Sequence, residues 1–124
     1  MSLSEQTATP FGRSMVLAGG LCGAAGVAFS AAATHRGGAF TGTAASFLLM
    51  HAPVFLLIGL AGGNRVLRIG GVILLVGLVV FSGDLLARDY LGSRLFPFAA
   101  PTGGTLLLAG WLAIALSALS RQRR

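Results

Sequence analysis

Three ionisable side chains stand out because they lie within, or at the ends of, long apolar segments. They are His35, His51 and Asp84. An ionisable group inside a membrane is costly to bury, so each is by default a candidate functional residue. Imidazoles can ligate haem iron, and buried Asp and His side chains can relay protons. The chemistry to consider is therefore redox or proton transfer.

The two histidines could hold a haem between two membrane helices, as axial imidazoles do in some helical bundles. His35 ends the first apolar segment, whereas His51 lies about seven residues into the second, or roughly 10 Å deep at the rise of an α-helix. Bis-imidazole ligation needs similar depths. A haem- or quinone-interacting protein using His51, with His35 or Asp84 assisting, is therefore an alternative. Zinc or copper would need further ligands that the sequence does not supply.

Structural roles explain the same residues more simply. Asp84 and Arg88 are four residues apart on one expected helix, which is the spacing of an ion pair. His51 could donate a single hydrogen bond across helices. In the expected topology His35, His51, Asp84 and Arg88 lie toward one side of the membrane, so we predict a buried polar cluster there. Structural roles are favoured over catalysis, and we expect no enzyme.

Four apolar segments must position these residues, and each is close to the roughly 20 helical residues that span a bilayer. They cover residues 14–33, 44–61, 66–87 and 100–120. Asp84 is the single acidic residue inside them. The sequence thus predicts an all-α integral membrane protein, an antiparallel bundle of four transmembrane helices with short loops. We expect residues 1–13 to form a polar, frayed tail and residues 121–124 a basic one.

The composition agrees with a membrane protein. The chain of 124 residues is 55% hydrophobic and 10% charged, with a mean hydropathy of +0.85, whereas soluble domains carry about 25% charged residues. The formal net charge is +6, and every basic residue is an arginine. These arginines sit at helix ends rather than on one basic face, so lipid headgroups are the expected partner and nucleic acid is not.

Small residues recur seven positions apart in every segment, which keeps one stripe of a left-handed bundle facing its neighbours. Close backbone approach along such stripes is how membrane helices gain packing energy. Gly19 and Gly23 also match the small-xxx-small pattern. We expect partners to be other transmembrane helices, in a hetero-complex or a homo-oligomer. The stripes are Gly19, Gly26 and Ala33; Ala45, Ala52 and Gly59; Gly70 and Gly77, which Asp84 extends; and Gly103, Gly110 and Ser117.

The distribution of arginine predicts the orientation, because cytoplasmic loops of membrane proteins carry an excess of Lys and Arg. With four spans both termini lie on one side. The richer side, which we expect to be cytoplasmic, holds Arg13, Arg65, Arg68, Arg121, Arg123 and Arg124, and the other side holds Arg36, Arg88 and Arg94. The expected location is a bacterial inner membrane.

Short motifs in a fixed order resemble a known family. They are Ala31-Ala32-Ala33-Thr34-His35, Met50-His51-Ala52, Phe81-Ser82-Gly83, Pro101-Thr102-Gly103-Gly104 and Gly110-Trp111. The chain resembles the small bacterial four-helix membrane proteins called domain of unknown function 423, related to the animal transmembrane-protein-256-like proteins. The resemblance implies an inner-membrane protein with no assigned biochemical role. Asp84 departs from the family pattern, where a small or hydroxyl residue is usual, and the stretch from His35 to His51 is shorter.

Taken together, these features predict a non-enzymatic accessory or structural subunit of a larger bioenergetic or photosynthetic membrane complex. No cofactor is expected, with haem or quinone as the alternative stated above. A small transporter is a further alternative, for which His51 and Pro53 at mid-depth are the motivation.

Overall fold

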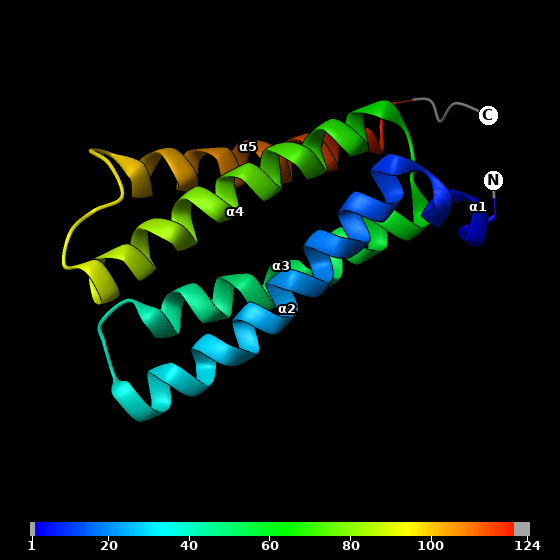
Figure 1. Cartoon of the computed structure of the whole chain (residues 1–124). Coiled ribbons are helices and arrows are strands. Elements are labelled where there is room, and N and C mark those ends of the chain that lie inside the picture. Colours follow the sequence, from blue (N-terminus) through cyan, green and yellow to red (C-terminus); the bar gives the residue numbers. More distant parts are fainter. Residues whose placement is uncertain (1, 121–124) are drawn as a thin grey trace.

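The computed structural model describes residues 2–120, and its regular structure is entirely helical. Four of its helices are long and apolar enough to cross a membrane, as the sequence predicts. Figure 1 shows them lying side by side, with a short helix at the N-terminal end. The helices are α1 (Leu3–Ala8), α2 (Pro10–Arg36), α3 (Thr41–Ala61), α4 (Arg65–Leu91) and α5 (Ala99–Ser117).

The long helices form two antiparallel hairpins. Helix α2 packs closely along α3, and α4 packs closely along α5; α3 and α4 join the two hairpins less extensively. The start of α2 and the end of α5 lie at the same end of the molecule (Figure 1). The helices are therefore arranged as two tight pairs, each closed by a short link.

Within each hairpin, glycines let the backbones approach closely. A Cβ atom on Gly19 would lie 2.9 Å from the carbonyl oxygen of Ala52 in α3, and one on Gly26 would lie 2.6 Å from Cγ of Leu49. In the second hairpin, a Cβ on Gly77 would lie 2.7 Å from the backbone nitrogen of Leu107. Further glycines in such close contacts are Gly59 against Gly12 and Met15, Gly70 against Ala113, Gly103 against Phe81 and Gly110 against Leu74. Gly23 has a looser contact, with its Cβ position 3.7 Å from Ala52.

Larger side chains fill the space between the hairpins. The rings of Phe47 in α3 and Phe81 in α4 lie 4.7 Å apart. Phe55, Leu74 and Leu78 are fully buried in the same core. Small residues thus set the spacing inside each hairpin, while aromatic and aliphatic side chains join one hairpin to the other.

The N-terminal segment is ordered, in contrast to the expected frayed tail. Ser2 and Glu5 form a capping box at the start of α1, and the Ser2 backbone N–H, which donates to the carboxylate, holds the pKa of Glu5 below its ordinary value. Thr9 then caps α2, which begins at Pro10, a favoured residue at a first helical position. Capping thus orders a segment that is polar in composition.

The long helices also differ in length from the expected spans. Helices α2 and α4 extend beyond them at both ends, α3 begins at Thr41, and α5 ends at Ser117. Polar residues such as His35 and Arg36 continue the last turn of α2 rather than ending it. The expected basic tail, 121–124, lies outside the described residues.

Candidate functional site

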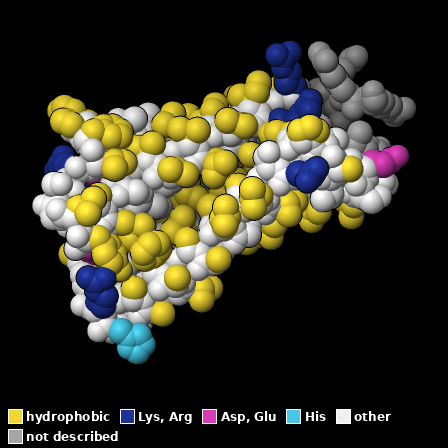
Figure 2. Space-filling view, in the orientation of Figure 1, with side chains coloured by type: hydrophobic (Ala, Val, Ile, Leu, Met, Phe, Trp, Pro, Cys, Tyr) yellow, Lys and Arg dark blue, Asp and Glu magenta, His cyan; other side chains and the backbone are white. Residues whose placement is uncertain are grey.

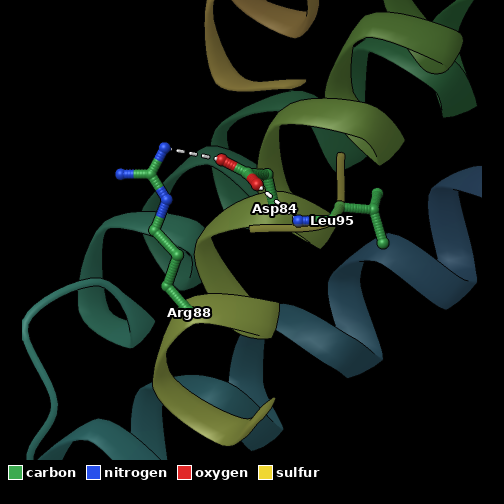
Figure 3. Close-up of polar contacts among 3 residues, drawn as sticks. All are labelled: Asp84, Arg88 and Leu95. Atoms are coloured by element: carbon green, nitrogen blue, oxygen red, sulfur yellow. Dashed lines mark hydrogen bonds and ion pairs between the residues drawn. The ribbon is translucent and has the colours of Figure 1, made fainter. Parts of the chain in front are cut away.

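Asp84 lies at the centre of the first polar group, on the inner side of α4 (Figure 3). Its side chain is fully buried. Oδ2 accepts a hydrogen bond of 2.8 Å from Nη2 of Arg88, so the ion pair expected from the spacing is present. Oδ1 accepts a second bond of 2.8 Å from the backbone N–H of Leu95, in the link between α4 and α5. One carboxylate thus pairs with an arginine of its own helix and also holds the following link against that helix.

Fewer of the polar atoms of Arg88 are hydrogen-bonded than those of Asp84. Its guanidinium carbon lies 5.2 Å from the ring centroid of Phe40, which adds a cation–π contact to the ion pair. Its Nε is buried and has no hydrogen-bond partner within residues 2–120. Both Asp84 oxygens already accept hydrogen bonds, one from Arg88 and one from the link between α4 and α5. The geometry favours a structural role for Asp84.

His51 belongs to a second, separate group. Its Nδ1 lies 2.7 Å from the carbonyl oxygen of Phe47, and its Nε2 lies 3.2 Å from the indole Nε1 of Trp111. The indole nitrogen can only donate, so the network assigns a neutral imidazole with its proton on Nδ1. His51 therefore accepts a bond from α5 and donates within α3, rather than donating across helices. It links the two hairpins at 4% exposure.

The depth of His51 is also greater than the sequence indicates. Because α3 begins at Thr41, His51 lies about ten residues, or roughly 15 Å, from the helix start. Both ring nitrogens are engaged, so ligation of haem iron by His51 would have to break one of its hydrogen bonds. Within residues 2–120, no group of three His, Cys, Asp or Glu side chains is placed to hold a metal ion.

His35 lies apart from both groups. It is exposed on the last turn of α2, and the neighbouring Arg36 stacks its guanidinium 4.4 Å from the ring centroid of Tyr90 in α4. The structure thus brings Asp84 together with Arg88 but keeps His35 and His51 elsewhere. Instead of forming one polar cluster, the four expected residues divide between the Asp84–Arg88 pair, the separate His51 group and the exposed His35.

Asp89 is a residue that sequence reasoning missed. Its Oδ2 accepts hydrogen bonds from the backbone N–H groups of Phe40 and Thr41, at 2.9 and 2.6 Å, and from the Thr41 hydroxyl at 2.6 Å. It thus caps the N-terminus of α3, where Phe40 offers no capping side chain, and its charge suits the helix dipole. The available signal was an acidic residue that the expected topology places on the same side of the membrane as the start of α3. That helix start has no capping side chain of its own.

Asn64 likewise caps a helix and joins two segments at the other end of the molecule. Its side-chain oxygen caps α4 through the N–H of Leu67, and its amide nitrogen donates to the carbonyl of Ser117 at 2.8 Å. The turn before it uses Gly62 and Gly63, both with positive φ near 75° and 73°. The Gly-Gly-Asn turn therefore also holds the end of α5.

The part of the chain that contains these groups has known relatives. Residues 22–104, more than half of the chain, match the family described as "Protein of unknown function (DUF423)". The chain belongs to this family. His51, Asp84 and Asp89 lie in the matched region of this DUF423 protein, and Trp111 lies beyond it.

A curated relative supports the same assignment. The UPF0382 membrane protein of Haemophilus influenzae is 31% identical over 75 residues, which cover 59% of this chain and 60% of that protein. The match thus spans less than two thirds of the relative's length. No solved structure matches the chain. This DUF423 protein is therefore a small membrane protein with four candidate membrane-spanning helices.

Proposed function

We propose that this protein is a non-enzymatic accessory or structural subunit of a larger membrane complex, in the bacterial inner membrane and serving energy conversion or photosynthesis. The proposal assigns the polar groups to holding the fold, as their geometry favours. The protein would then act through its outward helix surfaces.

The outward face of α2 is the observation that supports this role. Gly20 is exposed, and a Cβ atom there would meet nothing within 4 Å. Ala24, Ala28 and Ala31 continue the same exposed stripe at helical spacing. Small residues make little contact with lipid tails but allow another helix to approach closely. Larger side chains are also exposed beside this stripe, at Leu17, Leu21 and Val27 of α2, as Val79, Leu108 and Leu112 are on α4 and α5.

Substitution of Gly20 by leucine should release the protein from its complex. We expect retention of companion chains in mild detergent to fall by about tenfold or more, equivalent to about 1.4 kcal/mol, because the new side chain holds the approaching helix away. The measurement is quantitative mass spectrometry of chains that co-purify with the tagged protein.

Gly104→Leu in α5 is the matched control. Gly104 also has nothing within 4 Å of its Cβ position, so the same side chain is added to open space on another helix, and retention should not change. Isolation of the unmodified protein as a monomer without companions would contradict the proposal, as would equal behaviour of the two variants.

The arginine distribution leads us to propose that both ends of the chain face the cytoplasm. A reporter fused to the C-terminus should therefore behave as cytoplasmic, and one inserted in the link between α2 and α3 should behave as periplasmic. Periplasmic activity of the C-terminal fusion would reverse the orientation. It would also move Asp84 and Asp89 to the cytoplasmic side.

A further inference from the structure

The first turns of α4 carry an unusual concentration of positive charge. Arg65 and Arg68 are both exposed, and the first turn contains no acidic residue. A helix N-terminus already has a partial positive charge, where acidic groups are favoured and basic ones are not. Within residues 2–120 the salt bridge present is that of Asp84 with Arg88, so neither arginine pairs with a described carboxylate.

An apolar groove of about 380 Å³ begins beside these two arginines. It is lined by Phe11 of α2 and by Ile69, Val72 and Ile73 of α4, together with the two arginines. The guanidinium carbon of Arg68 lies 5.9 Å from the ring centroid of Phe11, at the boundary between the charged and apolar parts. Figure 2 shows arginine side chains at the end of the molecule where α4 begins, with hydrophobic side chains next to them.

The order of these features along α4 is that of a phospholipid in a bilayer. Arg65 begins the helix, and Ile69, Val72 and Ile73 follow at roughly 6 to 12 Å greater depth along its axis. A phosphate at the arginines would meet two guanidinium groups and the positive helix end, and an acyl chain would continue directly into the groove. Basic pockets between membrane helices are known to suit anionic headgroups.

We propose that this groove binds one anionic glycerophospholipid of the surrounding bilayer, with its phosphate at Arg65 and Arg68 and an acyl chain against Phe11, Ile69 and Val72. A free phosphate would leave the apolar groove unused, and a neutral lipid would leave the arginines without a counter-charge. The site is independent of the accessory role, because it uses neither the outward stripe of α2 nor a companion chain.

Native mass spectrometry of the full chain can test the site. The protein is released from micelles that contain phosphatidylglycerol and phosphatidylcholine of equal chain length, and the bound lipids are counted. Phosphatidylglycerol should be preferred. The double substitution Arg65→Gln and Arg68→Gln should reduce its binding by about 30-fold, because each arginine near anionic lipid contributes about fivefold.

Two further variants make the result specific. Arg13→Gln removes an exposed arginine of α2 that does not line the groove, and it should leave the preference unchanged. Val72→Trp fills the apolar part while keeping both arginines, and it should also displace the lipid. Circular dichroism should show unchanged helix content for every variant.

Several outcomes would overturn the site. They are equal binding of the two lipids, unchanged binding in the double arginine variant, an equal loss with Arg13→Gln, or unchanged binding with Val72→Trp. Displacement of phosphatidylglycerol by inorganic phosphate would show that a free anion is the ligand.

Discussion

Replacement of Asp84 by leucine should destabilise the folded protein by about 3–5 kcal/mol, the usual cost of removing one partner of a buried ion pair. The carboxylate is fully buried and accepts hydrogen bonds from Arg88 and from the Leu95 backbone. Leucine would leave both donors without their acceptor. The measurement is the free energy of unfolding in detergent micelles, followed by loss of helical circular dichroism.

Conservative substitutions separate the possible roles of Asp84. Asp84→Asn keeps an acceptor for the Leu95 N–H and should cost about 1–3 kcal/mol. Combined with Arg88→Gln its effect should be less than additive, because the two residues share one interaction. If Asp84→Asn left stability unchanged but abolished an activity of the assembled complex, proton handling would replace the structural role. Unchanged stability of Asp84→Leu would contradict the burial of the pair.

Gly103→Ala should destabilise the second hairpin by about 2–3 kcal/mol, even though alanine is the better helix former by about 1 kcal/mol. A Cβ atom at this position would lie 2.6 Å from the backbone nitrogen of Phe81 and 2.8 Å from its Cα. Those are backbone atoms of α4, which cannot turn aside as a side chain can. The two helices would have to separate, and unfolding in micelles would measure the cost.

The adjacent residue provides the control for this prediction. A Cβ on Gly104 would meet nothing within 4 Å, so Gly104→Ala should leave stability unchanged or raise it by up to about 1 kcal/mol. The first hairpin offers the same comparison in Gly19→Ala, whose Cβ would lie 2.9 Å from the Ala52 carbonyl oxygen, and Gly20→Ala, which is open. Equal effects within either pair would mean that the helices are packed differently.

The sequence by itself determined the membrane class and the four long helices. Whether a segment can span a bilayer depends on its length and on how few charged residues it contains. Both are local properties of the sequence. The pair of Asp84 and Arg88 was predictable for the same reason, because residues four apart on one helix are neighbours whatever the helix packs against. The residues matched by the family, 22–104, agree with the resemblance carried by the short motifs.

The tertiary structure decided which polar side chains meet. Trp111 reaches His51 across 60 positions of sequence, and Asp89 reaches Thr41 across 48. Both contacts depend on how far each helix is rotated about its axis and on how the hairpins pack. Those quantities are set by glycine contacts inside each hairpin and by rings such as Phe47 and Phe81 between them. A periodic stripe of small residues predicts which face of a helix is packed. It does not predict which other helix packs there, because small residues permit close approach of any neighbour.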